Sequence, residues 1–140
     1  MNINSNSMLK YMFILGVIVD GAIAISWFLI AFGSKIPNIL NGYTGTGADY
    51  QLAMYAAAMF MAGWTVLLVW GAMKPIERRG LLLITSVLLL LSVIIEFVFF
   101  QDMLGGAGFV FGVSKRIFLA VLAAAIYFYS FQGKESEHIA

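Results

Sequence analysis

Long apolar stretches separated by short polar ones dominate the chain. The apolar runs cover residues 11–32, 50–73, 81–100 and 109–131. An α-helix rises about 1.5 Å per residue, so about 20 apolar residues cross the hydrocarbon core of a bilayer. The pattern therefore predicts an all-α polytopic membrane protein. We expect residues 1–140 to form a single membrane domain, an antiparallel bundle of four transmembrane helices.

The segments between the apolar runs are polar or rich in glycine. We expect an extramembrane loop at 33–49, an inner loop at 74–80 and a polar tail at 132–140. Residues 36–40 of the first loop are expected to lie along the membrane interface. The glycines of this loop do not indicate a phosphate-binding loop, because no strand–loop–helix unit surrounds them.

The beginning of the chain has two interpretations. Ala31 and Gly33 form a small-x-small pair, which is typical of a signal-peptide cleavage site. The apolar run is longer than the usual apolar region of a signal peptide, about 7–15 residues, and a single cation, Lys10, precedes it. We therefore favour a retained first span, with the polar residues 1–7 disordered before it.

The composition agrees with a lipid environment and excludes several kinds of chemistry. The chain is 62% hydrophobic and 11% charged, whereas soluble domains carry about 25% charged residues. A net charge of +1 without a basic stripe gives no reason to expect a nucleic-acid partner. The sequence has no cysteine, and its one histidine is His138 in the tail. We therefore expect no metal site, no haem and no other cofactor, and no Ser-His-Asp catalysis within the bundle.

The distribution of cations predicts the orientation. With the N-terminus inside, five cations face the cytoplasm, namely Lys10, Lys74, Arg78, Arg79 and Lys134. Three face the other side, namely Lys35, Lys115 and Arg116. The positive-inside rule favours a prokaryotic cytoplasmic membrane protein with both termini cytoplasmic, and the opposite orientation stays open. Lys74, Arg78 and Arg79 are expected to mark topology and to contact anionic lipid headgroups or a protein partner.

One face of each predicted helix gathers small and polar residues, which indicates the side that turns towards the other helices. These faces consist of Gly16, Asp20, Ala24 and Trp27; Gln51, Tyr55, Ala58, Ala62 and Thr65; Thr85, Ser92 and Glu96; and Arg116, Ala120, Ala123, Tyr127 and Ser130. Lys115 instead shares a face with leucines and an isoleucine. We therefore expect Lys115 to face lipid and to extend towards the headgroups.

Charged residues inside the spans are candidates for function. Asp20 is expected about 15 Å into the first helix, where it must be protonated, paired or solvated. Glu96 and Arg116 are expected about 24 and 26 Å above the inner ends of their helices. Because these heights match, we predict a Glu96–Arg116 ion pair, with Gln51 and Tyr55 nearby. A pair that only fixes helix register is the alternative to a functional one.

The central part of the chain resembles a pattern found in other small membrane proteins. Ala62-Gly63-Trp64-Thr65-Val66-Leu67-Leu68-Val69-Trp70 and the following Lys74-Pro75-Ile76-Glu77-Arg78-Arg79-Gly80-Leu81-Leu82-Leu83 resemble a pattern in small uncharacterised prokaryotic four-helix membrane proteins. The resemblance covers about a third of the chain, implies the four-helix layout and carries no activity. The layout is also similar to that of four-helix sterol-binding and isomerase membrane proteins, whose acidic and histidine positions have no match here.

Three functional hypotheses follow. The first is a non-enzymatic accessory subunit of a larger membrane complex, or a self-associating bundle, whose partners are lipids and other membrane proteins or itself. The second is a binder or carrier of a small lipophilic or ionic ligand in an intramembrane cavity. Its candidate ligand-binding residues are Asp20, Gln51, Tyr55, Glu96, Arg116 and Tyr127. The third is a lipid-modifying isomerase or transferase, for which a carboxylate and a cation would suffice.

Overall fold

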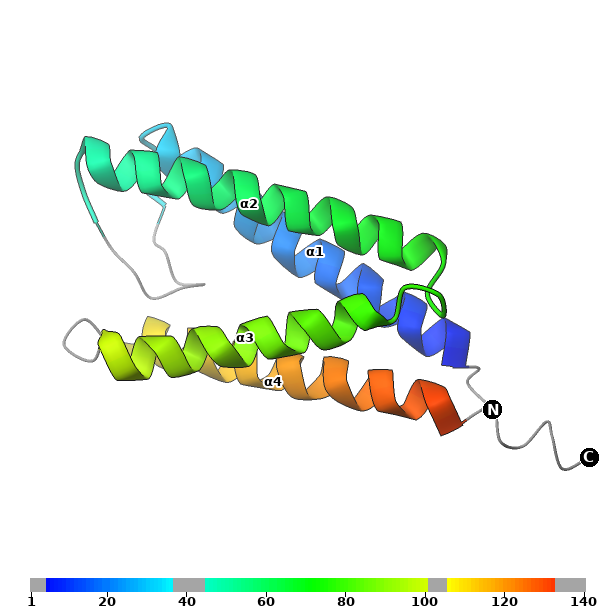
Figure 1. Ribbon diagram of the computed structural model, residues 1–140. Coiled ribbons are helices and arrows are strands. Elements are labelled where there is room, and N and C mark those ends of the chain that lie inside the picture. The colour runs from blue at the N-terminus through cyan, green and yellow to red at the C-terminus, as the bar shows by residue number, and fades with distance from the viewer. Residues whose placement is uncertain (1–4, 37–44, 101–105, 133–140) are drawn as a thin grey trace, which may run out of the picture.

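The computed structural model describes residues 5–36, 45–100 and 106–132, and it contains four antiparallel helices (Figure 1). These are α1 (Ser5–Ala31), α2 (Ala48–Met73), α3 (Gly80–Phe99) and α4 (Gly106–Gln132). Each is long and apolar enough to cross a membrane. The predicted all-α bundle of four membrane-spanning helices is therefore confirmed, and the chain is a multi-pass integral membrane protein.

The helices extend slightly beyond the apolar runs. α1 begins at Ser5, six residues before the first run, so residues 5–7, which were expected to be disordered, form its first turn. The other ends lie within three residues of the expected positions. Residues 1–4, residues 37–40 of the expected interfacial segment and the tail from 133 lie outside the described residues.

Local sequence explains where the first two helices end. Gly33 has φ +87°, a conformation that glycine adopts without strain. Its N–H donates to the Ile30 carbonyl, and the Ser34 N–H donates to that of Leu29, which satisfies the last turn of α1. At the end of α2, Pro75 disfavours a helical conformation at the preceding Lys74. Lys74 accordingly has φ −139° and ψ 72°, and a short turn over 74–79 leads into α3.

The four helices pack as two hairpins. α1 packs along α2, α3 packs along α4, and the two hairpins meet chiefly through α1 and α4. Figure 1 shows the α1–α2 hairpin as one layer and the α3–α4 hairpin as the other, joined at one end by the 74–79 turn. α2 and α3, although consecutive in the chain, make few close approaches.

A small apolar core joins the hairpins near the end that carries the 74–79 turn. Its buried members come from all four helices and are Leu9, Met12, Phe13, Leu68, Leu82 and Ala123. Leu119, Leu122 and Ile126 of α4 pack against this cluster. Most other large apolar side chains are exposed, for example Phe60 on α2 and Phe118 on α4. An exposed apolar surface of this extent is what lipid covers.

Candidate functional site

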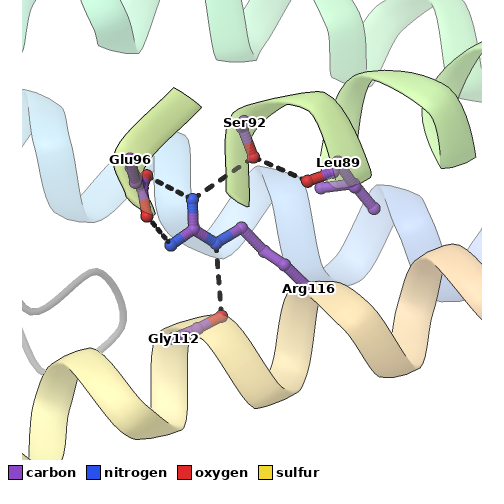
Figure 2. Close-up of polar contacts among 5 residues, drawn as sticks. All are labelled: Leu89, Ser92, Glu96, Gly112 and Arg116. Carbon is purple, nitrogen blue, oxygen red and sulfur yellow. Dashed lines mark hydrogen bonds and ion pairs between the residues drawn. The ribbon is translucent and has the colours of Figure 1, made fainter. Parts of the chain in front are cut away.

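The Glu96 carboxylate and the Arg116 guanidinium form a two-pronged ion pair between α3 and α4 (Figure 2). Arg116 Nη1 lies 2.5 Å from Glu96 Oε1, and Nη2 lies 2.6 Å from Oε2. The two side chains are only 15% and 13% exposed. The ion pair predicted from matching heights along the helices is therefore present.

Residues one helical turn away contribute further hydrogen bonds to Arg116. Arg116 Nε donates to the Gly112 carbonyl at 3.3 Å, and Nη1 also donates to the Ser92 hydroxyl at 3.3 Å. Ser92 in turn donates to the Leu89 carbonyl at 2.8 Å (Figure 2). All three guanidinium nitrogens thus have acceptors on α3 or α4, which offsets the cost of placing the charge at membrane depth.

A second pair of opposite charges lies between the hairpins. Asp20 of α1 and Lys115 of α4 are both partly buried and attract each other electrostatically. They belong to the two helices through which the hairpins meet. Lys115 therefore provides Asp20 with an opposite charge on another helix.

The expectation that Lys115 faces lipid was wrong. The residues that share its face, Leu119, Leu122 and Ile126, pack against the core instead of pointing outwards. The lipid-facing side of α4 is formed by other residues, among them Phe118 and Val121, which are 64% and 60% exposed. In a membrane bundle both faces of a helix are apolar, so leucine neighbours do not indicate which face meets lipid.

The described contacts of Gln51, Tyr55 and Tyr127 involve other residues of the bundle. Gln51 is exposed, and its side-chain nitrogen lies 3.6 Å from the position a Cβ would occupy on Gly33. Tyr55 is 44% exposed and meets Phe28 of α1 edge to face, with ring centroids 6.1 Å apart. Tyr127 packs edge-on against two aromatic rings of its own helix, those of Phe128 and Phe131.

The cations of the predicted inner loop have distinct partners. Lys74 forms an exposed ion pair with Glu77 at 3.0 Å. Arg78 stacks on the Trp70 ring of α2 and donates to the Trp70 carbonyl. Arg79 stacks on Phe131 of α4 and donates to both oxygens of Ser130, at 3.4 and 3.3 Å. The turn is therefore fastened to the ends of α2 and α4.

Sequence reasoning missed two polar interactions between helices. One is the Asp20–Lys115 interaction described above. The other is a hydrogen bond from the buried Ser86 hydroxyl to the Ala120 carbonyl at 2.9 Å. The signal for Ser86 was its position one helical turn after Leu82 and seven residues before Val93, both buried on the same face of α3.

The described residues contain no group of three His, Cys, Asp or Glu side chains placed to hold a metal ion. The chemistry that they offer is ionic and hydrogen-bonding: two carboxylates and two cations at membrane depth. No family model, curated protein or solved structure matches the chain, so its function has to be argued from these contacts.

Proposed function

We propose that this chain is a non-enzymatic membrane protein that acts as an accessory subunit of a larger membrane complex or as a self-associating bundle. The observation that supports this most is the set of partners that the Arg116 guanidinium has within its own hairpin. Its guanidinium is directed at Glu96, Ser92 and Gly112 of its own hairpin. A charge held in this way fixes helix register and leaves little capacity for substrate.

The outer face of α2 supports association with other helices. Ala53, Ala56 and Gly63 are exposed on this helix, and nothing lies within 4 Å of the position a Gly63 Cβ would take. Phe60 beside them is 82% exposed. Small residues let a neighbouring transmembrane helix approach closely, and a protruding aromatic ring can fill a groove on it.

Native mass spectrometry from lipid nanodiscs, prepared without detergent, tests this proposal. We expect a mass that contains either a second membrane protein or more than one copy of the chain. Gly63→Phe should reduce this assembly, because the added ring fits the bundle and blocks a partner helix. Ala125→Phe, at an exposed position on α4, is the matched control and should leave the assembly intact. A monomer without partners in the wild type would refute the proposal.

A second candidate, a binder or carrier of a small ionic ligand, is favoured by Asp20 and Lys115. Their interaction spans the seam between the hairpins, so a small ion entering there would exchange with one partner of the pair. Ionisable residues within spans often mark ion pathways. Thermal unfolding in detergent against a panel of ions separates the candidates. A stabilising ion whose effect is lost in Asp20→Asn but retained in Glu96→Gln favours the carrier.

We also propose that the 74–79 turn and both termini face the cytoplasm of a prokaryotic cell. The exposed Lys10 and the three cations of the turn support this orientation. Single cysteines at Lys10 and Thr46 provide the test, since the parent chain has no cysteine. A membrane-impermeant maleimide added to intact cells should label position 46 and not position 10; the reverse pattern would overturn the orientation.

A further inference from the structure

Arg78 is held against the end of α2 by two contacts with Trp70. Its guanidinium carbon lies 3.7 Å from the centroid of the Trp70 ring, and its Nη1 donates to the Trp70 carbonyl. Trp70 is 48% exposed, so the stacked pair lies on the outer surface of the bundle. The stacking and the hydrogen bond together give the cation a defined position before any ligand arrives.

The position of Trp70 indicates the depth of this pair in the membrane. Trp70 lies in the last turn of α2, directly before the charged 74–79 turn. Tryptophan rings concentrate at the headgroup layer because they are apolar with one polar group. A guanidinium stacked on such a ring lies at the level of the lipid phosphates.

The guanidinium retains donors for an acceptor outside the bundle. The described contacts of Arg78 use Nη1, and within the described part of the chain Nε and Nη2 donate to no acceptor. These two nitrogens lie on one edge of the guanidinium plane, an arrangement that matches two oxygens of a phosphate. Nearby Lys74 is neutralised by Glu77, so Arg78 supplies the uncompensated charge on this side.

We propose that Arg78 and Trp70 form a binding site for the headgroup phosphate of an anionic phospholipid. The lipid's phosphodiester accepts hydrogen bonds from Arg78, and its glycerol region lies against the Trp70 ring. Arg79, the next residue, carries the same charge but is directed to Ser130 and Phe131 at the α3–α4 side. Of these two neighbouring arginines, only Arg78 therefore belongs to the proposed site.

Native mass spectrometry of the delipidated full-length protein tests the site by titration with phosphatidylglycerol and with phosphatidylcholine. We expect tighter binding of phosphatidylglycerol in the wild type. Arg78→Gln should weaken that binding about fivefold, the effect of one cation at a membrane surface. Trp70→Leu should weaken it in the same direction, and it is the second variant if Arg78→Gln folds poorly.

The matched control is Arg79→Gln, which removes the same charge one residue away and should leave phosphatidylglycerol binding unchanged. If Arg78→Gln and Arg79→Gln weakened phosphatidylglycerol binding equally, the lipid would be bound by general electrostatic attraction to the basic turn and not at a defined site, and the proposal would be wrong. Equal binding of the two lipids would exclude selectivity for an anionic headgroup and would overturn the proposal. Competition by soluble glycerol phosphate at the same concentration as the lipid would show a free-phosphate site instead, and would overturn the lipid assignment.

Discussion

The aromatic ring of Phe13 in α1 occupies the space that a side chain on Gly71 of α2 would fill. A Cβ added to Gly71 would lie 2.5 Å from Phe13 Cε1 and 2.8 Å from Cδ1. Phe13 is completely buried and belongs to the core that joins the hairpins. The close approach of α1 and α2 at this end therefore depends on the absence of one methyl group.

Gly71→Ala should destabilise the protein, because the buried Phe13 ring has no room to move away. We expect a loss of about 1–3 kcal/mol in the free energy of unfolding, as for other overpacked cores. Gly63→Ala is the control, since nothing lies within 4 Å of its Cβ position and alanine favours a helix. Thermal unfolding in detergent measures the stability of both variants. Equal melting temperatures for Gly71→Ala and Gly63→Ala would contradict this packing argument.

Removing one partner of the Glu96–Arg116 pair should be costly. Glu96→Gln or Arg116→Gln leaves the other charge buried, at a cost of about 3 kcal/mol. The charge-swapped double variant Glu96→Arg with Arg116→Glu should recover part of the stability or expression that each single swap loses. A double variant no better than the singles would mean that the pair contributes little.

The exposed Lys74–Glu77 pair is the matched comparison for that experiment. Its side chains are 55% and 65% exposed, whereas those of the buried pair are nearly covered. Solvent screens such a pair, so Glu77→Gln should cost about 0.5 kcal/mol or less. Urea or thermal unfolding of both single variants in the same detergent gives the difference directly.

Ser86→Ala should loosen the contact between α3 and α4. The substitution removes the buried hydrogen bond to the Ala120 carbonyl, which is worth about 0.6 kcal/mol between transmembrane helices. Ser86→Leu should cost more, because Ala120 is completely buried and the larger side chain would push the helices apart. Steric trapping or thermal unfolding should rank wild type above Ser86→Ala and Ser86→Ala above Ser86→Leu.

Arg79→Gln should release the last turn of α4. It removes the hydrogen bonds to Ser130 and the stacking on Phe131. Hydrogen–deuterium exchange should quicken in residues 127–131 and stay unchanged at the end of α2. Arg78→Gln should give the opposite distribution, so identical exchange patterns in the two variants would show that the arginines do not fasten separate helices.

The sequence predicted the parts of the fold that follow from length and periodicity. Four apolar runs specified four helices, and the inward stripe of α4 was correct, since Ala120 and Ala123 are completely buried. The Glu96–Arg116 pair was predictable because both residues lie on neighbouring helices of one hairpin. Their heights, counted from the inner ends of α3 and α4, match to within about one residue's rise.

The Asp20–Lys115 interaction could not be predicted in the same way. α1 begins at Ser5, so Asp20 is fifteen positions from its first residue and about 22 Å along the helix. Lys115 is seventeen positions before Gln132, about 26 Å from that end. Counting from the first apolar residue placed Asp20 too low. Only tertiary packing shows that α1 packs against α4 while α2 and α3 make few close approaches.

The placement of charges in two hairpins has a consequence for biogenesis. Glu96 and Arg116 belong to consecutive helices, so this ion pair can form within the second hairpin as it leaves the translocon. Asp20 finds Lys115 only in the other hairpin. The first half of the newly made chain must therefore wait in the bilayer with an unmatched acid, and arrival of the fourth helix completes its neutralisation.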